Sequence, residues 1–515
     1  MLRRLGERRD PWDMVVVGGG ATGAGIAVDA ASRGYGVLLL ERSDFGKGTS
    51  SRSTKLVHGG VRYLEQGNIP LVMEALKERG ILRKNAPHLI SDLAFVVPSY
   101  DWWEAPFYGL GLKIYDALAG QYGFGKSRIL SPQETLESLP TIRTEELRGG
   151  VVYYDGQFDD ARLLIALVRT AADQGATLLN YAEVTGFSRD PKGCIDGVVA
   201  RDAEGAEAWQ IPARVVINAA GPFSDSVRML ANPGIEPLLS PSQGAHLVFD
   251  RSFLPGDSAI MVPHTRDSRV MFAIPWRGRT LVGTTDTPIE GTPLEPRPFE
   301  EEIAFILETS ARYLHKPPAR EDVKSVFAGI RPLVRVGKDT PTATLSRDHT
   351  IHVDSSGLVT IVGGKWTTYR RMAEETVDEA AEIAGLPERP CVTKNLRIRG
   401  FHEEPEQFGR LGPYGSDAPA LEKLMRDDPK LSQPLAAELP DTGAEVVWAA
   451  REEMARTLED VLARRLRALF LDARAAVAMA PAAAQLIGRE LGWDPGRRAR
   501  EVAAFTELAR GYTLS

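Results

Sequence analysis

DMVVVGGGATG, residues 13–23, is the most informative stretch of the sequence. Its apolar run ends at Gly18, and the glycines then recur as Gly18-x-Gly20-x-x-Gly23 before a helix-compatible run over residues 21–32. This order predicts a strand, a tight turn and a helix whose free N–H groups favour a diphosphate. The first glycine permits the turn, the second lets the backbone approach the pyrophosphate, and the third lets the helix pack on the strand.

A second apolar run, residues 37–40, ends at Glu41. That acid follows the glycine turn by about twenty residues, the spacing at which a carboxylate binds the ribose hydroxyls of an adenine dinucleotide. Strand, helix, second strand and acid together predict a dinucleotide site; the alternative is a structural βαβ unit with an empty turn. The motif by itself does not distinguish NAD from FAD.

Length and composition narrow the class of protein. A chain of 515 residues is too long for one compact core, so we expect two or three domains. Net charge is −7, which argues against a dedicated nucleic-acid binder. The two cysteines, Cys194 and Cys391, lie far apart, which argues for a reducing compartment and against a disulfide framework or a cysteine metal site. No segment has the pattern of a transmembrane helix or a signal peptide, so we expect a cytoplasmic protein, with the inner face of the cell membrane as a second location.

Periodicity predicts further elements along the chain. We expect a helix over residues 160–174 capped by Asp160, an antiparallel sheet within residues 236–330, and a strand over residues 358–362 that opens through Gly363 and Gly364 into a helix over residues 367–384. A helix N-terminus at that glycine pair would stabilise negative charge placed beside it. The plain alternative is a strand-to-helix turn.

Two groups of arginines have both a plain and a functional interpretation. Arg3, Arg4, Arg8 and Arg9 are interpreted as a solvated, frayed start, with a weak lipid anchor as the alternative. The helical, alanine-rich segment after residue 446 is interpreted as a cap with solvated charges, with a membrane-binding patch as the alternative. The arginines of this second group are Arg464, Arg465, Arg467, Arg497, Arg498 and Arg500.

Several longer motifs, in one order, carry a family resemblance over roughly residues 12–510. They are TSSRSTKLVHGGVRYLE (49–65), YYDGQFDDARL (153–163), VVINAAGPFSD (215–225), VGTTDT (282–287), AGIRPL (328–333), SRDHTI (346–351), VGGKWTTYRRMAE (362–374) and TLEDVLARRLRALFLD (457–472). This set resembles the FAD-dependent glycerol-3-phosphate dehydrogenases of the aerobic respiratory type, within the D-amino-acid-oxidase-like flavoprotein superfamily.

The resemblance implies an α/β fold with a Rossmann-like FAD-binding domain, an antiparallel β substrate domain and a C-terminal α-helical domain. We expect a discontinuous FAD domain at residues 12–85, 151–235 and 330–390. The substrate domain is expected at residues 86–150 and 236–329, and the helical domain at residues 395–515. The family also implies a homodimer.

FAD is expected to be bound without a covalent link, because neither cysteine lies in a cofactor motif, and no metal is expected. The loop at residues 49–53 offers hydroxyl and N–H groups to diphosphate and ribitol oxygens. The expected cofactor-binding residues are Gly18, Gly20, Ala21, Thr22, Gly23, Glu41, Arg42, Thr49, Ser50, Ser51, Ser53, His58, Gly59, Gly60, Val184, Ala219, Gly221, Gly364, Lys365, Trp366 and Thr367.

For the substrate, sn-glycerol 3-phosphate, the resemblance implies Arg62, Tyr63, His246, Thr284, Thr285, Arg331 and Lys365. A phosphate dianion needs several cations, and the planar fork of arginine suits it. The implied reaction is oxidation of a secondary alcohol to a ketone, with hydride transfer to flavin N5. His246 is the first candidate for the base, His58 is the rival, and a structural histidine is the alternative. Arg331 and Lys365 are the other catalytic candidates, holding alkoxide and phosphate in either order.

A membrane quinone is the electron acceptor that the resemblance implies. Rival enzymes are an oxidase that uses oxygen and a dehydrogenase of another polyol phosphate, such as erythritol 4-phosphate. A non-catalytic FAD-binding module is the rival from another class, and a nicotinamide dehydrogenase fits only the first motif.

Overall fold

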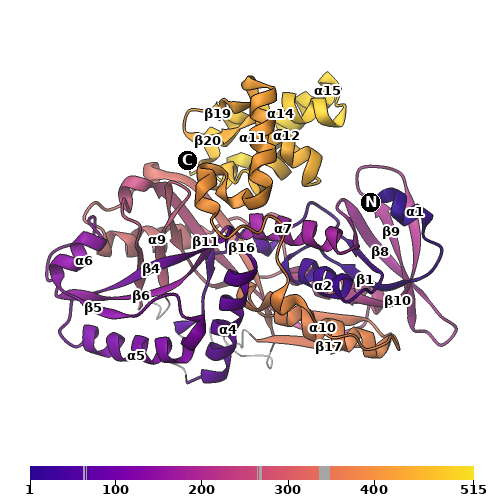
Figure 1. Cartoon of the computed structure of the whole chain (residues 1–515), viewed down its shortest axis with the longest axis horizontal. Coiled ribbons are helices and arrows are strands. Elements are labelled where there is room, and N and C mark those ends of the chain that lie inside the picture. Colours follow the sequence, from indigo (N-terminus) through magenta and orange to yellow (C-terminus); the bar gives the residue numbers. More distant parts are fainter. Residues whose placement is uncertain (62–63, 65–66, 264, 266–269, 336–347, 515) are drawn as a thin grey trace.

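Two β-sheets lie side by side, and a helical unit formed by the end of the chain covers their junction (Figure 1). The computed structural model describes residues 1–61, 64, 67–263, 265, 270–335 and 348–514. The arrangement confirms the predicted mixed α/β class with a helical C-terminal region.

The main path of the first sheet has the order β17-β18-β10-β1-β2-β7 and is parallel except for β17; off this path, β9 (Ile195–Asp202) pairs antiparallel with β10, and β8 (Ala182–Arg189) pairs antiparallel with β9. Its strands are β1 (Trp12–Val17), β2 (Val37–Leu40), β7 (Thr177–Leu179), β10 (Ala208–Asn218), β17 (His349–Val353) and β18 (Val359–Gly363). Because β1 and β2 are joined through α2 (Ala21–Ser32), the glycine turn lies at the carboxyl edge of this sheet. The helix and the second strand have the bounds that the sequence predicts.

Both faces of the first sheet are covered. Helices α2, α7 (Asp160–Asp173) and α10 (Tyr369–Ile383) share one hydrophobic core with β1 and β2. On the other face lie β8 (Ala182–Arg189), β9 (Ile195–Asp202) and α8 (Ser224–Ala231). Because β2 is buried on both faces, all four of its residues are apolar.

Two expectations about this region were wrong in detail. The cap of α7 is Asp159, whose carboxylate accepts from the N–H of Arg162 at 3.1 Å, and not Asp160. Asp160 is fully buried and binds Lys55 instead, so tertiary pairing overrides its local capping preference. The first residues are solvated as expected, since α1 (Leu2–Glu7) has no buried residue, but they are helical and not frayed. The guanidinium of Arg8 lies 4.1 Å from the centre of the Trp12 ring.

The second sheet is antiparallel except where β12 pairs with β4, as expected for residues 236–330. It contains β3 (Leu56–Val57), β4 (Ile90–Ser99), β5 (Arg128–Leu130), β6 (Gly149–Phe158), β11 (Leu239–Asp250), β12 (Ala259–Val262), β13 (Met271–Trp276), β14 (Arg279–Gly283), β15 (Thr287–Pro288) and β16 (Val323–Val334). Helices α4 (Ile69–Asn85), α5 (Glu104–Ala119), α6 (Pro132–Ser138) and α9 (Glu300–Tyr313) flank it. Strands β3 and β6 lie in this sheet although their residues fall in the segments expected for the FAD domain.

The C-terminal unit contains α11 (Ala418–Asp427), α12 (Gly443–Glu452), α13 (Ala468–Leu471), α14 (Ala473–Leu491), α15 (Pro495–Arg510) and the hairpin of β19 (Pro434–Ala436) and β20 (Leu439–Thr442). The interpretation of its charges as solvated was wrong for Arg464, Arg465 and Arg467, which are at most 3% exposed. They lie where the unit faces the rest of the chain, and each is paired there with a carboxylate. Among the described residues, no helix is both long and apolar enough to cross a bilayer.

Candidate active site

A groove of about 340 Å³ runs along the carboxyl edge of the first sheet. The glycine turn, Glu41 and the loop at residues 46–50 line it on one side, and residues 219–223 and 361–366 line it on the other. Among the expected cofactor residues, the groove wall includes Gly18, Gly20, Ala21, Thr22, Glu41, Arg42, Thr49, Ser50, Val184, Ala219, Gly221, Gly364, Lys365 and Trp366.

The glycine turn fits a diphosphate because a side chain there would close the backbone off. A Cβ on Gly18 would lie 2.6 Å from the carbonyl oxygen of Ala219, and one on Gly23 would lie 1.9 Å from that of Gly18. Gly20 is the N-cap of α2, and the N–H of Ala21 donates to the Ser50 hydroxyl at 2.9 Å. The helix start and the serine loop therefore present N–H and hydroxyl groups to one place.

Glu41 is held rigidly at the end of β2. Its carboxylate accepts hydrogen bonds from the N–H groups of Gly19 at 2.7 Å and Ser43 at 2.8 Å. Burial raises the pKa of Glu41, and these two hydrogen bonds oppose the rise. A fixed carboxylate in this wall is the acceptor that a pair of ribose hydroxyls requires.

The glycine pair turns sharply, but the helix after it starts later than expected. Gly363 and Gly364 have φ of +78° and +75°, and a Cβ on Gly364 would lie 2.3 Å from the sulfur of Met372. A 3₁₀ turn, Trp366–Thr368, comes before α10, so the predicted helix start at residue 367 was wrong by two residues. The indole N–H of Trp366 donates to the carbonyl of Ser50 at 2.9 Å, which joins this turn to the serine loop.

A second cavity of about 640 Å³ adjoins the groove and shares residues 363–366 with it. Its wall comes from both sheets and includes the expected residues Thr49, Ser53, His58, Gly60, His246, Thr284, Thr285, Arg331, Gly364, Lys365, Trp366 and Thr367. Ser51 and Gly59 are not in this wall: Ser51 is buried beneath the loop, and the N–H of Gly59 is held by the hydroxyl of Tyr115 at 2.9 Å. Arg62 and Tyr63 lie outside the described residues.

His246 is buried in the wall of the second cavity on β11. A hydrogen bond of 2.9 Å joins its Nε2 to the hydroxyl of Thr54, and its ring stacks on Phe327 with centroids 4.9 Å apart. Burial, and then the charges of Lys55 and Arg331, lower the pKa of His246 well below 6.5. The imidazole is therefore neutral near pH 7 and has the protonation state of a proton acceptor. His58, the rival, lies in the same wall.

Arg331 projects from β16 towards the two threonines. Its guanidinium donates to the Thr284 hydroxyl at 3.0 Å and to the Thr285 carbonyl at 2.9 Å, and it pairs with Asp286 at 3.2 Å. The Thr285 hydroxyl is instead occupied by Glu302 at 2.7 Å. Of the two threonines, only Thr284 has its hydroxyl beside the arginine.

Sequence reasoning missed Asp286 and Lys55. Asp286 follows the threonine pair directly in VGTTDT, so its acidic character beside a predicted cation site was the available signal. Lys55 is fully buried and pairs with Asp160 at 2.7 Å. Burial, opposed by Asp160, lowers the pKa of Lys55 to about 8. No local pattern predicts that pairing, because the two residues lie 105 positions apart.

Comparisons with known proteins agree on one family. Residues 13–370 match the model of the FAD dependent oxidoreductase family, and residues 359–498 match that of the C-terminal domain of alpha-glycerophosphate oxidase. Glycerol-3-phosphate dehydrogenase SDP6 of Arabidopsis thaliana is 40% identical over 98% of this chain and 87% of its own length. The mitochondrial glycerol-3-phosphate dehydrogenase of Mus musculus is 40% identical over 96% of this chain and 73% of its own.

A solved structure, glycerol-3-phosphate dehydrogenase from Bacillus halodurans complexed with FAD, is similar over nearly the whole chain. It superposes with a TM-score of 0.80 at 31% identity, covering 99% of this chain and 96% of the other. The similarity therefore extends through both sheets and the C-terminal unit.

Proposed function

This chain belongs to the glycerol-3-phosphate dehydrogenases within the FAD dependent oxidoreductase family, and we propose that it oxidises sn-glycerol 3-phosphate to dihydroxyacetone phosphate and passes the electrons to a membrane quinone. One observation carries the proposal: a neutral buried histidine, an arginine and a lysine line a cavity that shares a wall with the groove fitted to FAD.

FAD is the cofactor of the family, and its fit rests on the glycine turn, Glu41 and the serine loop. When bound, it supplies a hydride acceptor at flavin N5. Neither cysteine lines the groove or the second cavity, which supports binding without a covalent link. Residues 363–366, common to both cavities, would stand between the cofactor and the substrate.

His246 would remove the proton from the substrate hydroxyl while the carbinol hydrogen leaves with its electron pair. Its depressed pKa keeps it neutral before substrate binds. Stacking on Phe327 and the hydrogen bond to Thr54 hold the ring in one orientation. A base must lie within hydrogen-bond reach of the proton it removes, so this fixed orientation favours His246.

Arg331 and Lys365 would bind the phosphate and the developing alkoxide, in either order. Arg331 shares its charge with Asp286, but its fork still faces the cavity beside the Thr284 hydroxyl. Lys365 lines both cavities and is a point charge that suits a phosphate oxygen. A non-catalytic FAD-binding module would have no use for such a basic cavity.

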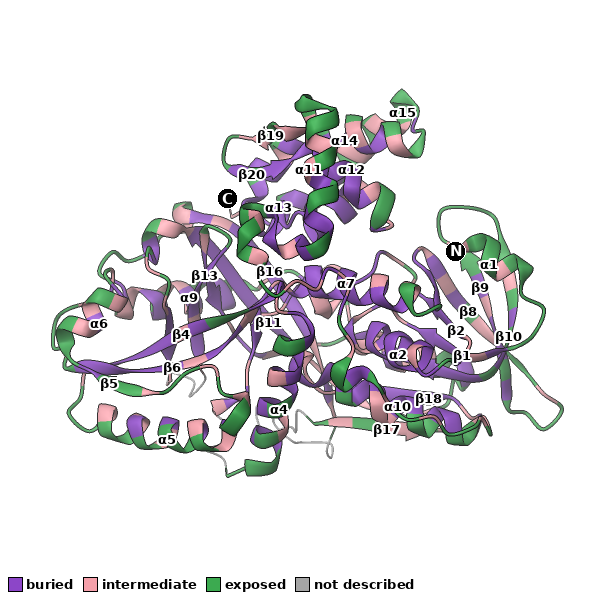
Figure 2. Ribbon diagram, in the orientation of Figure 1, coloured by how far each residue is buried: buried purple, intermediate pink, exposed green. Residues whose placement is uncertain are grey.

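For the acceptor, the supporting feature is a stripe of apolar residues on α5 that are exposed. Figure 2 colours the exposed residues of this helix green. Trp103, Phe107, Leu110 and Ile114 recur at helical spacing and are 44–65% exposed, and Trp102 beside them is 77% exposed. Lys113 and Lys126 are exposed close by in the chain. Aromatic and apolar residues on one face with cations near it are typical of a helix that lies in the membrane interface. We place peripheral attachment there rather than at the N-terminal arginines.

The test is anaerobic reduction of the purified flavoprotein. We expect sn-glycerol 3-phosphate to bleach the absorbance band of the oxidised flavin. If only erythritol 4-phosphate bleached it, erythritol 4-phosphate would be the substrate. Absence of bleaching by either compound would favour a non-catalytic module. Reoxidation should be fast with a quinone and slow in air; the reverse order would make the protein an oxidase.

A further inference from the structure

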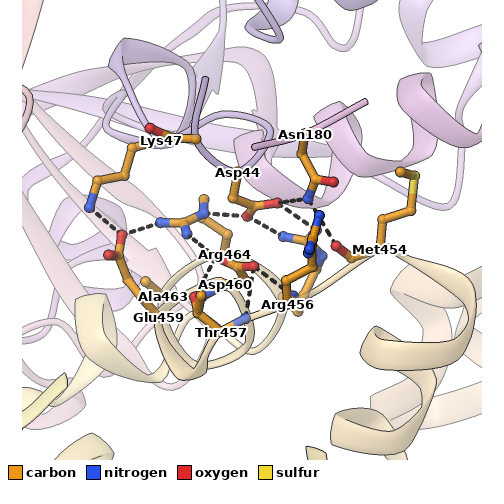
Figure 3. A network of polar contacts seen from close by, with 12 residues as sticks. Asp44, Lys47, Asn180, Met454, Arg456, Thr457, Glu459, Asp460, Ala463 and Arg464 are labelled. Carbon is orange, nitrogen blue, oxygen red and sulfur yellow. Dashed lines mark hydrogen bonds and ion pairs between the residues drawn. The ribbon is translucent and has the colours of Figure 1, made fainter. Parts of the chain in front are cut away.

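The loop that lines the groove at residues 46–50 has a second face, and that face is held by the C-terminal unit. The contact comes from one short segment that contains Glu459, the π-helix η11 (Asp460–Arg465) and Arg467. Figure 3 shows Glu459 and Arg464 of this segment beside Lys47 and Asp44. More than 400 residues separate these partners in sequence. The contact is therefore a purely tertiary feature of the cofactor site.

Asp44 is the centre of this contact. Its carboxylate is fully buried and accepts from Arg464 Nε at 2.5 Å and from two nitrogens of Arg465 at 2.7 and 3.0 Å. Burial alone would raise the pKa of Asp44, but Arg465 and Arg464 outweigh it and lower the pKa to about 2. The carboxylate is therefore ionised, with two guanidinium groups as partners.

Two further contacts, at Lys47 and at Ser51, hold the loop. Lys47 forms an ion pair with Glu459, which also binds Arg464 at 2.5 Å. Arg467 donates to the carbonyl of Ser51 at 2.8 Å and to Asp160 at 3.0 Å. Residues 44, 47 and 51 are thus held by the C-terminal unit. Lys47 also lines the groove, together with Gly46, Gly48, Thr49 and Ser50.

The geometry of η11 makes the contact possible. A π-helix is rare and occurs mainly as single turns at functional sites. Here it lets the adjacent Arg464 and Arg465 reach the same carboxylate. Asp460 anchors the turn through hydrogen bonds from the N–H of Arg456 at 2.7 Å and from the Tyr181 hydroxyl at 2.7 Å.

We propose that Arg464, Arg465 and Arg467 are positioning residues for the cofactor, because they fix the loop at residues 44–51 in the conformation that holds FAD. If the loop moved, Arg465 would lose its close carboxylate partner, Asp44, while Arg464 would keep only Glu459 and Asp460 of its own segment. A buried charge that loses its partner is strongly unfavourable. The loop and η11 therefore stabilise each other, and by linkage FAD binding at the loop must stabilise η11. The inference rests on the use of FAD but not on the identity of the substrate.

The first test measures FAD release from the holoenzyme. Arg465→Gln leaves Asp44 with a weaker partner set, and we expect flavin release after dilution to be about 10- to 100-fold faster, within the usual range of coupling between sites. The matched control is Ile487→Ala, which removes a buried side chain of α14 and should lower thermal stability while leaving Asp44, Arg464, Arg465 and Arg467 in place. Equal release rates from the two variants, compared at the same margin below their melting temperatures, would overturn the proposal.

A second test avoids the risk that a variant fails to fold. Hydrogen exchange of the full chain is compared with and without FAD. Slower exchange is expected at residues 459–467 on adding FAD, with little change in α15. Unchanged exchange at residues 459–467 would refute the coupling. Both tests omit glycerol phosphates, so their failure is distinct from failure of the proposed activity.

Discussion

A buried histidine without a charged partner costs stability. We expect His246 to offset this cost through a role at the cavity that it lines. Its Nδ1 has no hydrogen-bond partner among the described residues, and its pKa is held below 6.5 by burial and by nearby cations. A purely structural imidazole would be expected to use both ring nitrogens.

Replacing this side chain tests the role of the base. We expect His246→Asn to lower the rate of flavin reduction by glycerol 3-phosphate about 10²- to 10⁴-fold, the usual contribution of a general base. FAD content should stay near the wild-type level. His315→Asn, on the exposed surface, is the control and should be as active as the wild type. If His246→Asn is reduced at the normal rate, His58 becomes the candidate.

The depressed pKa of His246 also predicts the pH profile of the free enzyme. As the pH falls through 6.5, an ordinary histidine would take up a proton, but this one stays neutral. Thus kcat/KM should be level from pH 8 down to about pH 6. It is expressed per substrate dianion, because a phosphate monoester itself titrates at about pH 6. The unfolded chain binds that proton first, so the free energy of unfolding should fall below pH 6.5. An acid limb centred on pH 6.5 would contradict this account of the site.

Replacing Arg331 tests whether this residue binds the phosphate or the alkoxide. Arg331→Lys keeps the charge but loses the fork, so it loses hydrogen bonds of about 1.5–3 kcal/mol in strength, and kcat/KM should fall about 10- to 100-fold. A rise in KM alone would assign the phosphate, and a fall in kcat would assign the alkoxide. Arg335→Lys, exposed just beyond β16 and outside the cavity wall, is the control. No change in either constant would remove Arg331 from the site.

At the scale of elements, α5 has its largest apolar side chains on the outside. Apolar stripes normally face a core, and an exposed one indicates an interaction surface. Its inner face is narrow, with Gly109, Leu112, Tyr115 and Ala119 buried.

We expect the triple change Trp103→Ser, Phe107→Ser and Leu110→Ser to weaken binding to vesicles of anionic phospholipid. Turnover with quinone dissolved in those vesicles should fall, while turnover with a water-soluble acceptor should not change. The control, Ile383→Ser with Val392→Ser, removes exposed apolar residues elsewhere, outside both the groove and the second cavity. Equal co-sedimentation of the two variants would exclude α5 as the membrane contact.

At the scale of the whole molecule, the C-terminal unit is continuous with the catalytic region. One hydrophobic core joins residues of the second sheet to α12, α13 and α14. Phe470 of α13 packs edge-on against Phe327 with centroids 4.8 Å apart, and Phe327 in turn stacks on His246. A buried ion pair, Arg162 with Glu453 at 2.8 Å, joins the unit to α7.

This continuity predicts joint unfolding. Glu453→Ala leaves Arg162 buried without its carboxylate and should cost about 3–5 kcal/mol of stability. In urea, the tryptophan and flavin transitions should shift together to lower concentration. Glu490→Ala breaks the partly exposed pair with Arg451 and should cost at most about 1 kcal/mol. A shift of the tryptophan signal with an unmoved flavin signal would mean that the units unfold separately.

Secondary-structure elements and the fold class could be predicted from the sequence, because their signals are local. Glycine spacing, apolar runs and helical periodicity predicted α2, β2 and the antiparallel second sheet, since backbone conformation and burial patterns act over a few residues. The longer motifs predicted the family, and through the family the cofactor.

Tertiary structure alone decided how charged residues are paired. Asp160 looks like a cap and Arg465 looks like a solvated charge, yet each is buried against a partner far away in the chain. A charge enters the interior only when the complete fold brings its counter-charge beside it, and no local pattern encodes that distance. For the same reason the low pKa of His246 and the arginines that hold the loop at residues 44–51 became visible only in the assembled chain.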